Sequence, residues 1–393
     1  MLVTLATRTF TPEPTAAALR LGALARALAA GGDRVRVLTS RLAPSVARDA
    51  RRLADGGVDA GEDGGLVEVR RAPVLRDRTG AVRGYVSYMS FDVPLVARLL
   101  TRPRPDVVVS EPPPTTGAAV RIACAVRRVP YVYYCADIVS DAAALAGVPS
   151  VVVRTVAGLE SFALCGARRV IAVSDGVARR ARDLGARDVA VVPNGVRVPD
   201  AVVTGTPEGF PTCDGPVFVY AGTVARWLAP EVFVDAFERV RARLGDARLV
   251  FVGQGSGWAA LAERSQGVAG VEMIPAVSAD EADRWMARAT ATLASLRPGG
   301  YDYAYPTKIL ASLAQGTPVI YAGPGQAASD VAEGELGVAC NLDVDEVAEA
   351  MVGLASGTAA WVGAEGARAW VSAHRSVEAS SRAAAAVVRS ALA

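Results

Sequence analysis

Two successive series of short β-branched runs, separated by longer Ala-, Leu- and Arg-rich stretches, constrain the fold of this chain most. Helical periodicity marks most of the intervening stretches, for example Ala16–Ala30 and Gly117–Arg128. Repeated alternation of this kind predicts parallel, doubly wound sheets. The runs of the first series are Leu2–Thr7, Val35–Thr39, Val67–Arg70, Asp106–Ser110, Tyr131–Tyr134, Val170–Val173 and Val189–Val192.

The alternation stops at Pro193-Asn194-Gly195 and resumes after a stretch rich in Pro, Gly and Thr. The second series comprises Val217–Ala221, Arg248–Val252, Val271–Ile274, Ala291–Ala294, Pro318–Tyr321 and Leu336–Ala339. A chain of 393 residues also exceeds what one hydrophobic core usually serves. We therefore predict an α/β protein with two Rossmann-like domains facing a cleft. The predicted parts are residues 1–198, a linker 199–215, residues 216–372, and a final helix 373–393 that packs back onto the first domain.

Composition disfavours several classes of function. The net charge of +2 argues against nucleic acid as a partner. The only histidine, His374, lies in a C-terminal helical stretch, which disfavours a Ser-His-Asp mechanism. The five cysteines are scattered and form no close metal-type pair, which is typical of a reduced cytoplasmic protein. We find neither a signal peptide nor a run of the ~20 apolar residues that a membrane helix needs.

Basic residues are concentrated between Arg34 and Arg104, where fourteen Arg stand against eight acids. This excess fits contact with an anionic membrane surface, and it fits a solvated basic loop equally well. The expected location is therefore cytoplasmic, with peripheral contact at the inner membrane face left open.

Lys and Arg total 42, yet Lys308 is the only Lys. An ammonium on a flexible stem reaches a phosphate as a point charge, which Arg does not reproduce. Lys308 lies in Tyr301-Asp302-Tyr303-Ala304-Tyr305-Pro306-Thr307-Lys308-Ile309. There Pro306 is placed in the first turn of a helix, and Thr307 and Lys308 lie at the positive end of its dipole. Chance survival of one Lys and a buried aromatic hinge are the alternatives.

Two glycine-bearing loops follow the first two strands of the second series. Gly222-Thr223-Val224-Ala225-Arg226-Trp227 offers backbone amides and a guanidinium to a diphosphate, although Arg226 also fits an ordinary surface residue. Gly253-Gln254-Gly255-Ser256-Gly257-Trp258 resembles a dinucleotide fingerprint, but Trp258 replaces the third glycine. We interpret it as a turn bordering a nucleotide pocket, with an NAD enzyme as the alternative.

Asp343-Val344-Asp345 spells the Asp-x-Asp that some glycosyltransferases use to hold a divalent cation. It directly precedes a helical pattern, so a helix cap is the better interpretation. No metal site is expected.

With these motifs described, the chain resembles GT-B glycosyltransferases of family 4, particularly the bacterial branch that builds surface polysaccharides. The likeness extends over nearly all of the chain, and the order and spacing of the motifs are specific. The motifs are Thr11-Pro12-Glu13-Pro14, Ser110-Glu111-Pro112-Pro113, Cys135-Ala136-Asp137-Ile138, Val173-Ser174, Val192-Pro193-Asn194-Gly195-Val196, Tyr220-Ala221-Gly222, Val252-Gly253-Gln254-Gly255 and Pro306-Thr307-Lys308 through Gly316-Thr317-Pro318-Val319.

The resemblance implies retaining, metal-independent transfer of a sugar from a nucleotide-diphosphate sugar to a saccharide, lipid-linked or small-molecule acceptor. UDP is expected ahead of GDP or dTDP, and no cofactor is expected. The implied catalytic residues are Arg226, Lys308 and Asp137. The implied acceptor-binding residues are Glu13, Glu111 and Asp137. The implied donor-binding residues are Gly222, Thr223, Gly253, Gly255, Ile274, Asp302, Tyr303, Pro306, Thr307, Ile309 and Ser312.

Three positions depart from the family pattern. Tyr303 and Ala311 stand where many members carry two glutamates, so ribose binding passes to Ser312 or another group. Ala136 replaces a frequent His or Arg before Asp137, and Asp137 itself fits either an acceptor-side carboxylate or a structural hydrogen-bond acceptor. A sugar-nucleotide-binding partner protein with little catalysis is therefore the alternative function. A GT-B epimerase is disfavoured because the cleft loops lack histidine.

Overall fold

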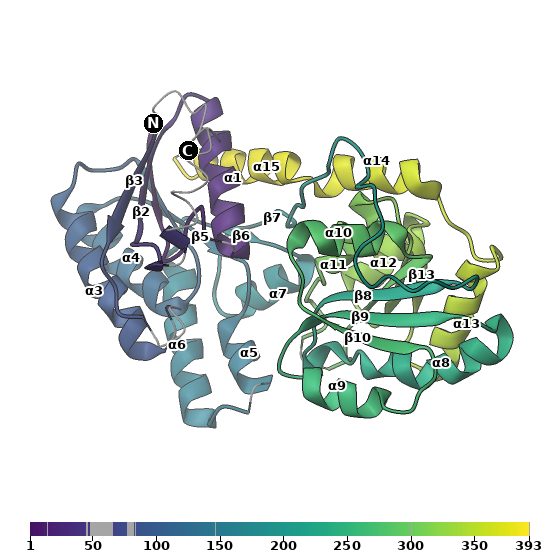
Figure 1. Ribbon diagram of the computed structural model, residues 1–393. Helices are drawn as coiled ribbons and strands as arrows, with labels where there is room; N and C mark the ends of the chain where they lie inside the picture. Colours follow the sequence, from purple (N-terminus) through teal and green to yellow (C-terminus); the bar gives the residue numbers. More distant parts are fainter. Residues whose placement is uncertain are drawn as a thin grey trace. The chain divides into compact units, whose positions relative to one another are not determined.

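The computed structural model describes residues 1–13, 15–44, 46–47, 66–76, 82, 84–145, 147–299 and 301–392. Pro14 and much of the Arg-rich stretch 34–104 therefore lie outside the described residues. Contacts divide the chain into two units, one formed by Met1–Asn194 with Val377–Ala393 and the other by Gly195–Ser376. Residues 199–215, predicted as a linker, belong to the second unit, and the final helix belongs to the first (Figure 1).

The first unit contains a seven-stranded parallel sheet in the order β3-β2-β1-β4-β5-β6-β7. Ala6 of β1 lies opposite Leu38 of β2 on one edge and opposite Ser110 of β4 on the other. Strands β2 and β3 therefore extend the sheet on one side of β1, and β4 to β7 extend it on the other. The strands are β1 Leu2–Ala6, β2 Arg34–Ser40, β3 Val67–Ala72, β4 Val107–Ser110, β5 Tyr131–Cys135, β6 Arg169–Ala172 and β7 Val189–Val191.

Helices cover both faces of this sheet (Figure 1). Leu21 of α1 and Val388 of α15 pack with Val3 and Leu5 of β1 in one buried cluster. On the other face α3 lies beside α4, and α4 beside α6. The helices are α1 Ala16–Ala30, α3 Tyr85–Thr101, α4 Pro114–Arg127, α5 Val139–Leu145, α6 Ser150–Gly166, α7 Asp175–Asp183 and α15 Val377–Ser390.

The second unit contains a six-stranded parallel sheet in the order β10-β9-β8-β11-β12-β13. Its strands run close to the predicted bounds, because each buried run is framed by turn residues. They are β8 Val217–Thr223, β9 Arg248–Gln254, β10 Val271–Pro275, β11 Ala291–Ser295, β12 Val319–Ala322 and β13 Gly337–Cys340. Together the two sheets establish the predicted class of two Rossmann-like α/β units.

Aromatic side chains fill the core of the second unit. Phe233 of α8 packs with Phe218 and Phe251 on one face of the sheet, and Trp285 of α10 packs with Val250 on the other. Among the described residues, no helix combines the length and apolarity needed to cross a membrane. The helices are η1 Arg226–Leu228, α8 Glu231–Leu244, α9 Trp258–Ser265, α10 Ala279–Arg288, α11 Lys308–Ala314, α12 Gln326–Glu333, α13 Val344–Ala355 and α14 Gly363–Arg375.

The Asp-x-Asp sequence forms a helix cap, as predicted. Asp343 Oδ1 accepts hydrogen bonds from the amides of Asp345 at 2.9 Å and Glu346 at 3.0 Å, at the start of α13. Within the described ranges, no three His, Cys, Asp or Glu side chains are grouped so that they could hold a metal ion.

Gly117 sets the distance between α4 and the sheet. A Cβ atom there would lie 2.6 Å from Cε2 of Tyr133 and 2.7 Å from Cβ of Ala163. Tyr133 is fully buried, so its ring has no space into which it could withdraw. Gly158 of α6 offers a contrast, because a Cβ there would meet nothing within 4 Å.

We expect Gly117→Ala to lower the free energy of unfolding by about 1–3 kcal/mol, because it overpacks the junction of α4, α6 and β5. The matched change Gly158→Ala should raise it by about 0.5–1 kcal/mol through helix propensity alone. Urea unfolding of both variants measures the difference. Equal effects of the two changes would contradict this account of the packing.

Candidate functional site

The carboxyl edge of the second sheet contains a topological switch point. The strand order places β8 beside β11, so the chain proceeds in opposite directions along the sheet from these two strands. Loops that follow such strands diverge and leave space for a ligand. Gly222 and Thr223 end β8 and Arg226 follows it, while the stretch leading to Lys308 follows β11.

The glycines after β8 and β9 allow their two loops to touch. A Cβ atom on Gly253 would lie 2.0 Å from the Gly222 carbonyl oxygen, and one on Gly255 would lie 2.0 Å from that of Val224. The Val224 amide donates a hydrogen bond of 2.8 Å to the Gln254 carbonyl. Side chains at these glycines would separate the loops, so the fingerprint-like sequence serves loop packing.

Lys308 reaches from the start of α11 to the end of β8. Its Nζ lies 3.3 Å from the centroid of the Tyr220 ring and donates to the Thr223 carbonyl oxygen at 3.4 Å. The Tyr220 hydroxyl donates to the same oxygen at 3.0 Å. The ring and the carbonyl together fix where the ammonium lies, the former by a cation–π interaction.

Lys308 is not paired with any carboxylate among the described residues. The residue as a whole keeps partial exposure, whereas its ammonium lies deep among surrounding atoms. This desolvation lowers the pKa of Lys308 well below its usual value. An anion that entered here would meet a cation with no competing partner.

Tyr220 opens the motif Tyr220-Ala221-Gly222, but the sequence predicted no role for it at the site. It is fully buried in β8 and resembles any other aromatic strand residue. Tyr220 lies beside the ammonium only because β8 packs against α11 in the fold. The two contacting residues, Tyr220 and Lys308, are 88 positions apart in sequence. No pattern within β8 alone could have indicated that contact.

Arg226 begins the short helix η1 and is exposed. Its side chain lines a cavity of about 460 Å³ together with Glu231, Ser256 and Arg264. Its own carbonyl accepts a hydrogen bond of 3.3 Å from Nε of Arg297, which fixes the loop backbone. Among the described residues, no carboxylate pairs with Arg226. Arg226 and Lys308 thus both border the loop after β8.

Three aromatic rings lie beside this loop. Trp227 and Tyr301 meet edge to face with centroids 5.5 Å apart, and Tyr301 and Tyr303 follow at 5.0 Å. Asp302, between the two tyrosines, is exposed and accepts a hydrogen bond of 2.7 Å from the Gly299 amide. The cluster offers ring faces at the loop that carries Arg226.

Two of the predicted donor-binding residues have fully buried side chains. Ser312 is fully buried, and its hydroxyl accepts from Thr292 Oγ1 at 2.5 Å and donates to the Thr317 carbonyl at 3.1 Å. Ile309 is likewise fully buried in the core. Both side chains point inward because one face of α11 covers the sheet, and their contact with a donor stays a prediction.

Helix α11 begins later than the sequence predicted, so Pro306 and Thr307 precede it. The helix begins at Lys308 with Thr307 as its cap residue, so Pro306 precedes the helix and is not in its first turn. The Pro306 carbonyl accepts a hydrogen bond of 3.1 Å from the Ile309 amide, which makes the entry a tight turn. Thr307 is exposed beside Lys308.

Ile274 lies apart from the two cations. It lies on β10, the edge strand that pairs with β9. There it lines a cavity of about 480 Å³ with Thr206, Glu281 and Arg284. This cavity combines an apolar wall with charged groups. The loop after β9 lies between it and the loop that carries Arg226.

Two predicted acceptor residues in the first unit are already paired. Glu13 is 6% exposed and forms an ion pair with Arg76 at 3.3 Å. Glu111 is 4% exposed, pairs with Arg20 at 3.1 Å and accepts from Thr7 Oγ1 at 2.7 Å. Buried carboxylates held in this way fix the loops that carry them, and their binding of an acceptor stays a prediction.

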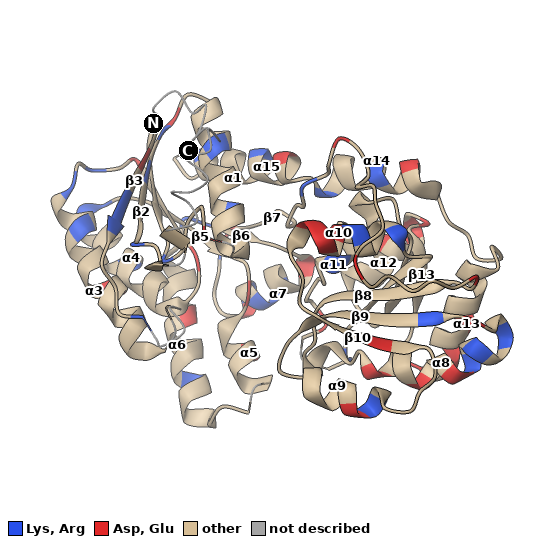
Figure 2. Ribbon diagram, viewed as in Figure 1, with Lys and Arg blue, Asp and Glu red and all other residues tan. Residues whose placement is uncertain are grey.

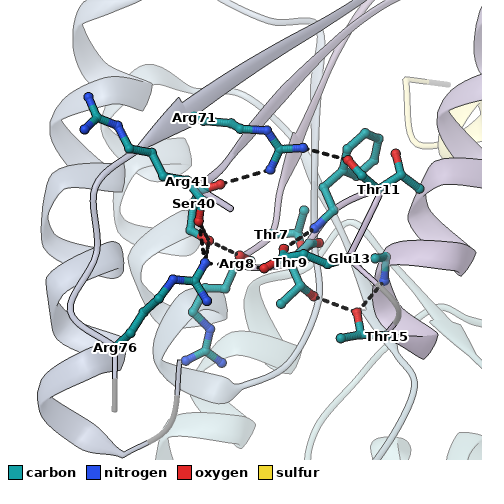
Figure 3. A network of polar contacts seen from close by, with 12 residues as sticks. Thr7, Arg8, Thr9, Thr11, Glu13, Thr15, Ser40, Arg41, Arg71 and Arg76 are labelled. Atoms are coloured by element: carbon teal, nitrogen blue, oxygen red, sulfur yellow. Dashed lines mark hydrogen bonds and ion pairs between the residues drawn. The ribbon is translucent and has the colours of Figure 1, made fainter. Parts of the chain in front are cut away.

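A network of arginines joins these loops (Figure 3). Arg71 donates to the carbonyls of Ser40 at 3.0 Å and Thr11 at 2.6 Å, and Arg76 donates to Ser40 Oγ at 3.2 Å. Part of the basic excess between Arg34 and Arg104 is therefore used to tie together the ends of β1, β2 and β3.

Asp137 follows β5 at the carboxyl edge of the first sheet. It is half-buried, and its Oδ1 accepts a hydrogen bond of 2.9 Å from the Ile138 amide just before α5. This bond supports the structural role that the sequence left open. The acceptor role of Asp137 stays a prediction.

Two family models match the chain. Residues 15–195 match the glycosyl transferase 4-like domain, and residues 215–356 match the glycosyl transferases group 1 model. The first range covers β2 to β7 of the first sheet and leaves out β1, and the second covers all six strands of the second sheet. A search of curated protein sequences returns no match.

Solved structures of glycosyltransferases share the fold over the whole chain. HepE from Anabaena, in complex with UDP and glucose, is 18% identical with a TM-score of 0.68, over 99% of this chain and 100% of that one. Sucrose-phosphate synthase from Thermosynechococcus elongatus is 16% identical with a TM-score of 0.71, over 99% and 98%. A glycosyltransferase from Rickettsia africae is 13% identical with a TM-score of 0.68, over 100% and 98%. The two-sheet architecture and the two family matches agree, and the chain belongs to the group 1 glycosyltransferases of the GT-B fold.

Proposed function

We propose that this glycosyltransferase takes its sugar from a nucleotide-diphosphate donor held at the switch point of the second unit. The observation that carries the proposal is the Lys308 ammonium, fixed by Tyr220 and Thr223 and left without a carboxylate. Departure of a nucleoside diphosphate develops negative charge, and preplaced cations stabilise it in the transition state. Lys308 and Arg226 supply that charge, so the transfer needs no metal ion. Retention of anomeric configuration is proposed from the family likeness.

UDP is the proposed nucleotide. HepE, which shares the fold, was solved with UDP and glucose, and this likeness supports UDP ahead of GDP or dTDP. The cavity beside Ile274 is the proposed place of the base and ribose, since Ser312 is buried and Ala311 offers no polar group. Glu281 and Arg284 at this cavity are candidates for the polar contacts that the family's glutamate would make. The transferred group is proposed to be a hexose.

Replacing Lys308 should reduce turnover far more than it reduces folding stability. Lys308→Met removes a charged hydrogen bond from a desolvated site, and we expect a loss of about 30- to 1000-fold in kcat. Arg239→Met, which removes an exposed cation paired with Asp345, is the matched control and should leave turnover unchanged. Release of UDP from a panel of UDP-sugars with broad acceptors, measured in EDTA, gives both rates.

Two outcomes of that assay contradict the proposal. Near-normal turnover by Lys308→Met would remove Lys308 from the site, and loss of wild-type activity in EDTA would remove metal independence. A wild-type protein that binds nucleotide sugars yet releases no UDP with any acceptor would favour the alternative, a sugar-nucleotide-binding partner protein. The burial of Ser312 keeps that alternative open, because it leaves the ribose without an assigned side chain at α11.

Nucleotide binding should depend on pH through Lys308. Because burial lowers its pKa in the free protein, a bound diphosphate must raise that pKa again by stabilising the ammonium. Between the two pKa values, binding therefore takes up a proton, and affinity falls as pH rises. Calorimetry of UDP binding at alkaline pH, in two buffers of different ionisation enthalpy, measures the uptake. Lys308→Met should abolish it, and an unchanged uptake in that variant would assign the proton elsewhere.

Peripheral membrane contact is proposed for one surface of the first unit, the α3–α4 face. Val86 and Val93 of α3 are 69% and 60% exposed, and Val126 of the neighbouring α4 is 68% exposed. Arg98 of α3 donates a hydrogen bond of 2.7 Å to the Arg70 carbonyl on β3, which joins this face to the basic residues of β3 (Figure 2). Apolar side chains within a basic surround suit an anionic bilayer.

We expect the protein to co-sediment with vesicles that contain phosphatidylglycerol, and to be released by salt. Val93→Glu on the α3–α4 face should abolish co-sedimentation, whereas Val151→Glu, which places the same charge at a 64% exposed position of α6, should not. Absence of salt-sensitive binding would favour the solvated basic loop over membrane contact.

A further inference from the structure

A carboxylate of the second unit, Asp330 on α12, holds the chain that leads to Lys308. Its side chain is 10% exposed, and its Oδ2 accepts a hydrogen bond of 3.1 Å from the Tyr305 hydroxyl. The same oxygen pairs with the Arg375 guanidinium at the end of α14, and Oδ1 accepts from Gln326 Nε2 at 2.8 Å. Tyr305 stands three residues before Lys308, which begins α11. Asp330 therefore joins the entry of α11 to α12 and α14.

Arg375, the cationic partner of Asp330, is itself fixed in place. Its side chain is 11% exposed, and its guanidinium carbon lies 5.0 Å from the centroid of the Tyr305 ring and 5.9 Å from that of Trp370. Its carbonyl oxygen accepts a hydrogen bond of 2.8 Å from the Val196 amide, close to where the chain enters the second unit. Because charge-assisted hydrogen bonds are strong, a carboxylate paired with an anchored cation can hold a third group in a defined position.

The loop before Tyr305 also lies against the start of α12. Gly325 precedes that helix with a φ of 88°, and a Cβ atom there would lie 2.1 Å from the Asp302 carbonyl oxygen. A side chain at this position would both clash and strain the backbone, so the approach requires glycine. Helix α12 thus contacts the loop beside Gly325 and binds it again through Asp330.

The position of the Lys308 ammonium depends on how the chain enters α11. Ile309 and Leu313 are fully buried and fix the body of the helix, whereas Lys308 is its first residue. The ammonium has to meet two partners at once, the Tyr220 ring at 3.3 Å and the Thr223 carbonyl oxygen at 3.4 Å. A hydrogen bond of that length is already close to the limit, so a small displacement of the helix start would break it.

We propose that Asp330 is a positioning residue for Lys308, and that it acts by holding the Tyr305 hydroxyl against Arg375. With Tyr305 held, α11 begins where the ammonium reaches both the Tyr220 ring and the carbonyl. Without that hold, the entry of the helix shifts and the ammonium leaves its two partners. The inference rests on the proposed function for its catalytic meaning, because Lys308 is the cation proposed to meet the diphosphate.

The position of Lys308 can be measured without donor, acceptor or nucleotide, because it is the only Lys in the chain. Protein that carries lysine labelled with carbon-13 at Cε gives a single lysine signal in NMR spectra. Its chemical shift reports the Tyr220 ring, which lies 3.3 Å from Nζ, and its titration gives the pKa of Lys308. In the wild type, burial keeps that pKa well below its usual value.

Two variants test the role of Asp330. Tyr305→Phe removes only the hydroxyl that Asp330 binds, and Asp330→Asn removes the charge that pairs with Arg375. We expect each to move the Lys308 signal towards that of free lysine, and to raise the pKa of Lys308 towards its ordinary value as the ammonium regains water. We also expect kcat to fall by about 10- to 100-fold, the loss that a misplacement of about 1 Å can cause.

Two matched controls remove similar interactions elsewhere in the chain. Ser265→Ala removes a buried hydroxyl of the second unit that donates to the Leu261 carbonyl at 2.8 Å. Asp33→Asn neutralises a 6% exposed carboxylate of the first unit that pairs with Arg389 at 2.8 Å. Both controls should lower the thermal midpoint and leave the Lys308 signal and its titration unchanged.

An unmoved Lys308 signal in Tyr305→Phe would overturn the inference, even if kcat fell, and the proposed role of Lys308 would stand. Equal movement in the two controls would also overturn it, because the effect would then be a general loss of stability. A signal that moves in Tyr305→Phe and Asp330→Asn while kcat stays unchanged would do the reverse. It would establish Asp330 as the positioning residue and refute the proposed role of Lys308 in transfer.

Discussion

The Lys308 ammonium, fixed by neutral partners, is the interaction on which the proposed chemistry depends. A buried ammonium is usually paired with a carboxylate, because an uncompensated charge is expensive to desolvate. Here the ring of Tyr220 and the carbonyl of Thr223 orient the ammonium without cancelling its charge. A carboxylate at the same place would hold the side chain as firmly, but it would compete with every diphosphate. Burial without a carboxylate partner lowers the pKa of Lys308, and it leaves the charge of the ammonium available to an anion.

Closed ion pairs hold the loops of the first unit together. Glu13 pairs with Arg76 and Glu111 with Arg20, and the pairs join positions 63 and 91 residues apart in sequence. Buried ion pairs stabilise a fold most when their remaining lone pairs and protons are also satisfied. Glu111 meets this condition in part, because its Oε1 also accepts a hydrogen bond from Thr7 Oγ1. These carboxylates therefore fix the loops that follow β1 and β4.

Sequence patterns predicted the strands and the importance of Lys308, because both are local properties of the chain. Alternating apolar runs mark strands directly, and a single Lys among arginines stands out by composition alone. The burial of Ser312 could not be predicted because, in a helix of seven residues, periodicity does not tell which hydroxyl faces the core. The ion pair of Glu111 could not be predicted because its partner Arg20 lies far away in sequence. The contact of Tyr220 with the ammonium could not be predicted for the same reason, since it joins two separate elements.

The two units use their buried charges differently, and the chemistry of transfer explains the difference. A departing diphosphate gains negative charge, so the proposed site in the second unit needs a cation whose charge is not already cancelled. The Lys308 ammonium meets that need, because its contacts are the Tyr220 ring and the Thr223 carbonyl. In the first unit, Glu13 and Glu111 close ion pairs with Arg76 and Arg20, and these charges hold loops in place. A carboxylate paired with Lys308 would compete with the donor in the same way. The placement of acids, more than that of bases, therefore decides which cations are left to bind an anion.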